Sequence, residues 1–236
     1  MAICSQITSP YFPLFKPEVV DQVNLHEEYF KSGMAKIIKN FNFRLVGLED
    51  VKNRIKKMAM FMLLQLIRQR MELESIGVRF SAHMCFTGAA GTGKTLVARR
   101  YASVLRKLGV ISKGHLVVAR RDDLVGQYIG HTAPKTKAVL RKAEGGVLFL
   151  DNANDLYKPN NPRDYGSEVI ELLLEHMEKL RNPFVIVFAG YKTPMDAFFL
   201  RNPGLAARVL CHIDFPNYTM IELVLIAFLT CKNKQY

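Results

Sequence analysis

Eight consecutive residues combine glycines, a lysine and a hydroxyl group at fixed spacing. They read Gly88-Ala89-Ala90-Gly91-Thr92-Gly93-Lys94-Thr95 and fit the pattern G-x-x-x-x-G-K-[ST] at every fixed position. The glycines allow backbone N–H groups to turn inward around an anion without a Cβ in the way. Lys94 can then reach the β- and γ-phosphates of ATP, and the Thr95 hydroxyl can ligate Mg²⁺. The segment therefore predicts a phosphate-binding P-loop, and the alternative is a glycine-rich turn that happens to carry a lysine.

A second motif is an apolar stretch that ends in an acid. It reads Val147-Leu148-Phe149-Leu150-Asp151. This is the Walker B pattern, in which the aspartate orders the hydration shell of Mg²⁺. The chain between the two motifs is long enough for this strand to return beside the P-loop strand. We therefore predict that Thr95 and Asp151 form the metal site and that Lys94 and Asp151 are catalytic. The alternative is a strand-end aspartate that caps a turn.

The residue after Asp151 is Asn152, where many ATPases carry a glutamate that polarises the attacking water. An amide can hold a water by hydrogen bonds, but it cannot accept the proton of that water. We therefore expect nucleotide and Mg²⁺ binding to remain while hydrolysis is slowed, so the sequence leaves ATPase activity open. Asp155 is a poor substitute, because one helical turn displaces a carboxylate by roughly 5 Å.

Around these motifs, short apolar stretches alternate with helical patterns. The predicted strands span residues 84–87, 115–119, 147–151 and 185–189. The predicted helices span residues 26–41, 51–73, 95–108, 132–143, 166–180, 195–202 and 221–229. The alternation predicts an α/β fold with a mostly parallel sheet between two layers of helices. In such sheets ligands bind at the carboxyl ends of the strands, where the P-loop and Asp151 are expected.

Composition limits the protein class. Hydrophobic residues make up 49% of the 236 residues, which indicates a globular chain, and the net charge is +12. The basic residues are spread over several elements, so nucleic-acid binding is a less favoured alternative. The four cysteines have neither metal-ligand nor disulfide spacing, which favours a reducing compartment. The first residues lack the basic start of a secretory signal, and the longest apolar run is too short to span a bilayer. We expect a soluble protein without membrane contact.

Five further segments make the prediction more specific. They read RDDLVGQYIGHTAPKT (121–136), DYGSE (164–168), FAGYK (188–192), NPGLAAR (202–208) and DFPNY (214–218). With the P-loop and the Walker B pattern, they resemble the CbbX-type red-type Rubisco activases of the AAA+ ATPases. The resemblance extends from about residue 45 to about residue 227.

The resemblance implies a hexameric ring in the plastid stroma that uses ATP to remodel inhibited Rubisco. The ring could be built from this chain alone or mixed with a homologue, and a sugar bisphosphate is a possible effector without an assigned site. Arg208 matches the family's arginine finger, and its alternative is a helix-end ion pair. Tyr128, Ile129 and Gly130 match the pore loop that grips a peptide, and the alternative for Tyr128 is a buried core aromatic.

The resemblance also divides the chain. Residues 1–44 are expected to form an N-terminal arm and helix, residues 45–218 the AAA+ nucleotide-binding domain, and residues 219–236 the start of a helical lid. Because the family continues into a longer lid, we expect most of that lid to be missing. Together with Asn152, this favours a second hypothesis, a regulatory ATP-binding subunit of a mixed ring with little hydrolysis of its own.

Overall fold

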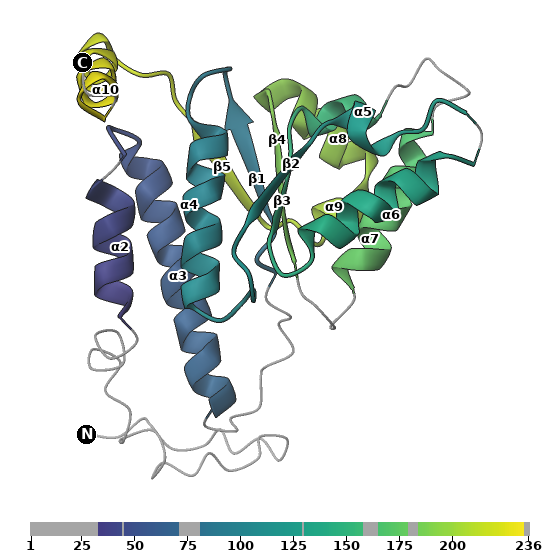
Figure 1. The fold of residues 1–236 in the computed structure, drawn as a ribbon, viewed down its shortest axis with the longest axis horizontal. Coiled ribbons are helices and arrows are strands. Elements are labelled where there is room, and N and C mark those ends of the chain that lie inside the picture. Colours follow the sequence, from purple (N-terminus) through teal and green to yellow (C-terminus); the bar gives the residue numbers. More distant parts are fainter. Residues whose placement is uncertain are drawn as a thin grey trace, which may run out of the picture. The chain divides into compact units, whose positions relative to one another are not determined.

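A parallel sheet organises residues 36–236, which form one compact unit. The computed structural model describes residues 33–43, 45–70, 81–128, 130–157, 165–178 and 184–233. Within these residues, five parallel strands lie in the order β2-β3-β4-β1-β5 (Figure 1). The strands are β1 (Met84–Gly88), β2 (Leu116–Ala119), β3 (Val147–Leu150), β4 (Val185–Gly190) and β5 (Cys211–Phe215).

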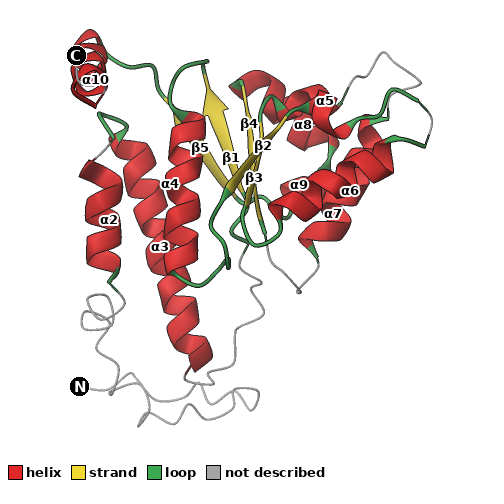
Figure 2. Cartoon of the chain, in the orientation of Figure 1, coloured by secondary structure: helices red, strands yellow, loops and turns green. Residues whose placement is uncertain are grey.

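Helices cover both faces of this sheet, as Figure 2 shows. On one face lie α3 (Glu49–Arg70) and α4 (Lys94–Lys107), and on the other lie α6 (Thr132–Ala143), α7 (Gly166–Met177) and α8 (Lys192–Arg201). The other described helices are α2 (Met34–Phe43), α5 (Arg121–Leu124), the 3-10 helix η2 (Ala153–Leu156), α9 (Pro203–Ala206) and α10 (Met220–Asn233). The predicted three-layer α/β fold is therefore confirmed.

Burial explains which strands the sequence revealed. Every residue of β3 and β4 is buried, because helices cover both faces of these central strands, and such strands read as continuous apolar runs. β5 is an edge strand in which Ile213 and Phe215 are buried, whereas His212 and Asp214 are exposed. This half-polar pattern gave no strand prediction for β5.

The predicted boundaries can be compared with the described elements. The four predicted strands lie within one residue of their predicted bounds, and α6 coincides with its predicted range. α8 begins three residues earlier than predicted, and α10 extends beyond residues 221–229 at both ends. Parts of the predicted helices, namely residues 26–32, 71–73 and 179–180, lie outside the described residues. One expectation is wrong: β3 does not return beside β1, because β4 lies between the two strands.

A hydrophobic core fills the space between the sheet and helices α6 to α9. Leu140, Val169, Phe188 and Phe199 are among its buried side chains. The rings of Phe188 and Phe199 meet edge-on with their centroids 5.8 Å apart, a favoured aromatic geometry. This packing holds α6, α7 and α8 against β3 and β4, and so fixes the strand ends that carry the site.

Candidate nucleotide-binding site

The P-loop connects β1 to α4 at the carboxyl edge of the sheet. Gly88, Gly91 and Gly93 have φ angles of +147°, +80° and +89°, in the region that favours glycine. A Cβ at Gly88 would lie 2.6 Å from the carbonyl oxygen of Phe215 in β5. A larger residue at position 88 would therefore strain the backbone and also collide with the neighbouring strand.

Hydrogen bonds shape the loop from within and from outside. The Thr92 hydroxyl donates to the carbonyl oxygen of Ala89 at 2.8 Å. The Tyr218 hydroxyl, from the segment after β5, donates to the carbonyl oxygen of Thr92 at 3.2 Å. Lys94 Nζ donates to the carbonyl oxygens of Gly88 and Ala89 at 2.9 and 2.6 Å. The loop is thus already folded, and Lys94 lies across its rim.

The amino-terminal end of α4 faces this loop. Its N-cap residue, Gly93, makes no side-chain capping hydrogen bond, so no cap side chain competes for the first-turn N–H groups. Unsatisfied N–H groups at a helix N-terminus attract anions. Thr95, in the first turn, is exposed. The loop therefore fits the phosphate groups of a nucleotide. It offers them the glycine backbone, the uncapped helix end, Lys94 and Thr95.

Asp151 lies at the same edge of the sheet as the P-loop. It directly follows β3, and its N–H donates to the carbonyl oxygen of Ala119 at 2.9 Å, which continues the ladder to β2. Partial burial lowers the pKa of Lys94, and the negative charge of Asp151 opposes this lowering of the Lys94 pKa. The two side chains are therefore close enough to interact, and the structure brings Lys94, Thr95 and Asp151 to one edge.

Arg120 is a member of this site that motif spacing did not reveal. Its Nε and Nη2 atoms donate to Asp151 Oδ2 at 3.0 and 2.9 Å. The next residue, Arg121, donates from Nη1 to the carbonyl oxygen of Asp155 at 2.8 Å. The signal was present in the sequence, since Arg120 follows a predicted strand, but only the register of β2 against β3 places it opposite Asp151.

Asn152 occupies a strained position between Asp151 and η2. Its φ is +51°, in the left-handed region that asparagine tolerates better than most other residues. Asp155, which the sequence offered as a poor substitute base, accepts a hydrogen bond from Asn154 Nδ2 at 2.9 Å. Asn154 Oδ1 is buried and has no hydrogen-bond partner within the described part of the chain.

Asn154 also lies against Gly190, the last residue of β4. A Cβ at Gly190 would lie 2.6 Å from Asn154 Oδ1, so this amide packs on the backbone of Gly190.

Strand β5 carries a second polar cluster. Asp214 in β5 accepts hydrogen bonds from Lys192 Nζ at 2.7 Å and from the Thr87 hydroxyl. Both hydrogen bonds lower the pKa of Asp214, and the bond from Lys192 has the larger effect.

Comparison with known proteins identifies the family. Residues 84–209 match the ATPase family associated with various cellular activities (AAA). The chain is 53% identical over 214 residues to a "Protein CfxQ homolog" of Trieres chinensis, which covers 91% of this chain and 73% of that protein. It is 51% identical over 214 residues to "Ribulose bisphosphate carboxylase/oxygenase activase, chloroplastic" of Cyanidioschyzon merolae, with coverage of 91% and 72%. It is 48% identical over 231 residues to "Protein CbxX, chromosomal" of Cupriavidus necator, with coverage of 98% and 72%.

The chain belongs to the AAA+ family of CfxQ and CbxX proteins. Its resemblance to the red-type Rubisco activases is confirmed. Membership of an ATPase family implies nucleotide binding with a divalent metal in general. Within the described residues, no cluster of three or more His, Cys, Asp or Glu side chains could hold a metal ion. The Thr95 hydroxyl and the Asp151 carboxylate are oxygen donors of the kind that Mg²⁺ takes together with phosphate oxygens and waters.

Within the single chain, Arg208 lies far from Thr95 and Asp151. It precedes β5, and its carbonyl oxygen accepts a hydrogen bond from Ser81, which precedes β1. Because β1 and β5 are parallel, Arg208 is at the amino edge of the sheet, opposite the P-loop. Its Nη2 pairs with Glu178 and its Nη1 donates to the carbonyl oxygen of Gly204 at 2.9 Å. In the single chain, Arg208 therefore makes the helix-end ion pair.

The segment that matches the family's pore loop connects α5 to α6. Tyr128 is 67% exposed, so it is not a core aromatic, and its ring meets that of His131 edge-on at 5.5 Å. Gly130 has a φ of +80°, and Ile129 lies outside the described residues. The base of the loop is fixed, because the N–H of Gly126 donates to the Thr132 hydroxyl at 3.1 Å.

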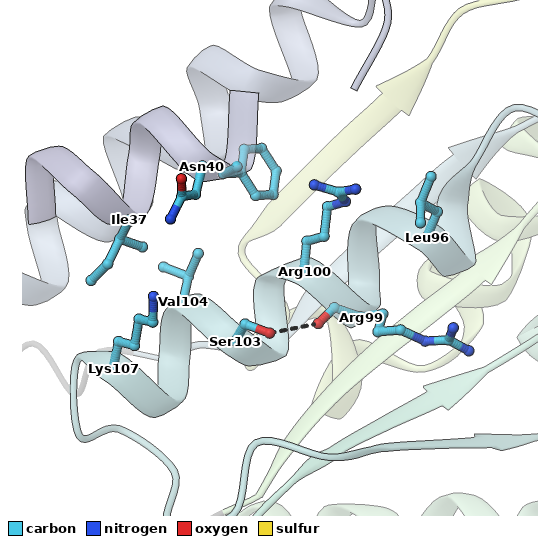
Figure 3. A pocket seen from close by; sticks show the side chains of 9 residues that line it. Ile37, Asn40, Leu96, Arg99, Arg100, Ser103, Val104 and Lys107 are labelled. Carbon is cyan, nitrogen blue, oxygen red and sulfur yellow. Dashed lines mark hydrogen bonds between the residues drawn. The ribbon is translucent and has the colours of Figure 1, made fainter. Parts of the chain in front are cut away.

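A hollow of about 470 Å³ lies between α2 and α4, on the far side of α4 from the sheet. Figure 3 shows Arg100 and Lys107 of α4 together with Asn40 and Ile37 of α2 around it. Arg99 also lines the hollow, and none of the lining residues that the structure describes is acidic. The hollow is therefore positively charged, and it is separate from the P-loop.

None of the described helices is long and apolar enough to cross a membrane.

Proposed function

We propose that this chain is an ATP-binding subunit of a AAA+ ring that remodels inhibited red-type Rubisco in the plastid stroma. The observation that carries the proposal is the folded P-loop at the same edge of the sheet as Asp151. The chain is also 51% identical to a protein named as a chloroplast activase of Rubisco. Residues 45–218 form the nucleotide-binding domain in this proposal. Residues 1–44 precede it as an arm and helix, and residues 219–236 begin the lid.

Each residue of the site has a separate task in this proposal. The backbone of residues 88–95 holds the ATP phosphates, and Lys94 leaves the carbonyl oxygens of Gly88 and Ala89 to bind the terminal phosphates. Thr95 and Asp151 hold Mg²⁺, which supplies neutralisation of the phosphate charge. Asn152 orients water without accepting its proton.

The ring supplies what one chain lacks. Arg208 is at the sheet edge opposite its own P-loop, so it serves as an arginine finger only toward a neighbouring subunit, after it leaves Glu178. Tyr128, Ile129 and Gly130 grip an extended Rubisco segment, which the exposure of Tyr128 supports. A sugar bisphosphate effector needs a positively charged site, and the hollow between α2 and α4 is the candidate site for this effector.

Rubisco reactivation tests this function. Red-type Rubisco inhibited by a sugar phosphate is incubated with ATP and this protein, alone and mixed with a full-length homologous activase. We expect faster recovery of carboxylase activity than without the protein, and no gain with the Lys94→Ala variant. An unchanged recovery rate in both the single and the mixed reactions would contradict the proposal.

A second candidate function is a regulatory subunit that binds ATP with little hydrolysis of its own. Asn152 favours it, because removal of a general base typically costs about 10²- to 10⁴-fold in rate. In the reactivation assay this candidate predicts an effect in the mixed reaction and none with the chain alone. Recovery by the chain alone at the rate of the full-length homologue would exclude it.

A further inference from the structure

The register of the sheet places an arginine directly opposite the Walker B aspartate. Ala119 and Leu150 are the last paired residues of β2 and β3, so the residues that follow them, Arg120 and Asp151, leave the sheet side by side. Both Nε and Nη2 of Arg120 converge on one oxygen, Asp151 Oδ2. With this contact in place, the side chain of Asp151 remains 25% exposed.

The backbone of Arg120 is held where this contact needs it. The N–H of Arg120 donates to the Asp123 carboxylate at 2.8 Å, which caps the first turn of α5. Arg121 instead donates to the carbonyl oxygen of Asp155, so the two neighbouring arginines hold different parts of the segment after β3. Arg120 is therefore positioned toward Asp151 by its own backbone as well as by its charge.

We propose that Arg120 is a built-in counter-cation for Asp151 that competes with the divalent metal. This inference rests on the proposed function, in which Asp151 holds Mg²⁺ beside the bound phosphates. When the guanidinium occupies Asp151 Oδ2, it supplies a positive charge next to Lys94 and the P-loop. Mg²⁺ must displace it to use the same oxygen. Nucleotide binding by this chain therefore depends less on a divalent metal than it would without Arg120.

The size of the effect follows from the exposure of the pair. The side chain of Arg120 is 69% exposed, so water and salt compete for the guanidinium, and it can swing away from Asp151. Exposed ion pairs contribute modestly, which corresponds to roughly a two- to fivefold change in an equilibrium. Arg120 thus shifts the balance between two states of Asp151 and does not block the metal.

The test is the affinity for fluorescent ADP, measured at constant ionic strength with Mg²⁺ and with EDTA. The wild-type ratio of the dissociation constant in EDTA to that in Mg²⁺ is the reference for each variant. Arg120→Ala weakens binding in EDTA and strengthens it with Mg²⁺, so the ratio of the two constants rises at least about fourfold. Arg141→Ala removes the same charge from the exposed end of α6 and leaves the ratio unchanged.

Two results would overturn this inference. One is an Arg120→Ala ratio equal to that of the wild type, and the other is an equal change of the ratio in Arg120→Ala and Arg141→Ala. If the wild type binds no nucleotide in either buffer, the proposed function fails, and Mn²⁺ binding to the free protein, followed by electron paramagnetic resonance, decides the competition. Arg120→Ala then gains about two- to fivefold in Mn²⁺ affinity if Arg120 competes, and equal affinities refute the competition.

Discussion

At the scale of single residues, the proposal makes Asn152 the residue that slows ATP hydrolysis without weakening nucleotide binding. Asn152→Glu supplies a proton acceptor next to Asp151, so we expect the steady-state ATPase rate to rise at least about tenfold. ATP affinity should stay within about threefold, because Asn152 lies outside the P-loop. The φ of +51° disfavours glutamate, so we also expect a loss of about 1 kcal/mol of folding stability.

Asn152→Gln is the matched control for this change. Glutamine has the length of glutamate and the same backbone strain, but its amide accepts no proton. ATPase rates that are equal for the Glu and Gln variants would show that hydrolysis is not limited by a missing base at position 152.

His83 makes folding stability depend on pH. It is buried before β1, its Nδ1 accepts the N–H of Ile186 in β4 at 2.9 Å, and burial lowers its pKa from 6.5 to about 4. Between these pH values the unfolded chain binds the proton and the folded chain does not, so stability falls as the pH is lowered from 6.5 to 4. The full loss is about 3 kcal/mol, and no further loss from His83 occurs below pH 4.

His83→Asn keeps a hydrogen-bond acceptor at this position but removes the titration. Urea denaturation of both proteins between pH 7 and pH 4 measures the effect, and the difference between them removes the contribution of carboxylates that titrate in both. We expect the wild type to lose more stability than the variant, by up to about 3 kcal/mol. Parallel stability curves would contradict the assignment.

At the scale of elements, the close packing of η2 against α7 holds the segment that follows Asp151 and Asn152. A Cβ at Gly166, the first residue of α7, would lie 1.7 Å from the carbonyl oxygen of Leu156, the last residue of η2. Because backbone cannot yield as a side chain does, we expect Gly166→Ala to destabilise the fold by about 3 kcal/mol. Urea denaturation checks this value.

Gly204→Ala is the matched control, since Gly204 also lies in the first turn of a helix. A Cβ there would meet the flexible end of Leu174 at 3.3 Å, and alanine favours the helix, so we expect a change within about 1 kcal/mol. Equal destabilisation by the two variants would refute the packing argument.

The elements also show what sequence can predict. The P-loop and Asp151 were found because each motif lies within one strand-to-loop segment, where spacing along the chain alone specifies the chemistry. Arg120 was missed because its contact depends on the register of β2 against β3. Asp214 lies in β5 and Tyr218 follows it, so their hydrogen bonds to Thr87 and Thr92 depend on where β5 lies. The half-polar pattern of β5 gave no strand prediction. The positive φ of Asn152 leaves no trace in composition or periodicity.

At the scale of the whole molecule, the proposal makes ATPase activity depend on assembly through Arg208. The proposal places its guanidinium at the nucleotide of a neighbour, so Arg208→Ala should lower the ATPase rate of the assembled ring by about 10³-fold or more. Nucleotide affinity of the isolated chain should remain unchanged, because Arg208 lies at the sheet edge opposite its own P-loop. The measurement is ATPase rate against protein concentration, with and without a full-length homologue.

Glu178→Gln is the control, because it weakens the ion pair of Arg208 without removing the guanidinium. We expect this variant to keep the ATPase rate of the wild-type ring. If Arg208→Ala and Glu178→Gln lower the rate equally, Arg208 acts through its ion pair within the chain and not on a neighbour.

ATP binding at residues 88–95 is tested most directly by measuring nucleotide binding and hydrolysis separately on the same purified sample. We expect saturable ATP binding by the wild type and at least about tenfold weaker binding by Lys94→Ala, since hydrogen bonds to charged groups contribute about 1.5–3 kcal/mol each. The wild-type turnover should lie well below that of Asn152→Glu. No ATP binding by the wild type, or equal affinities for the wild type and Lys94→Ala, would contradict an ATP site at this loop.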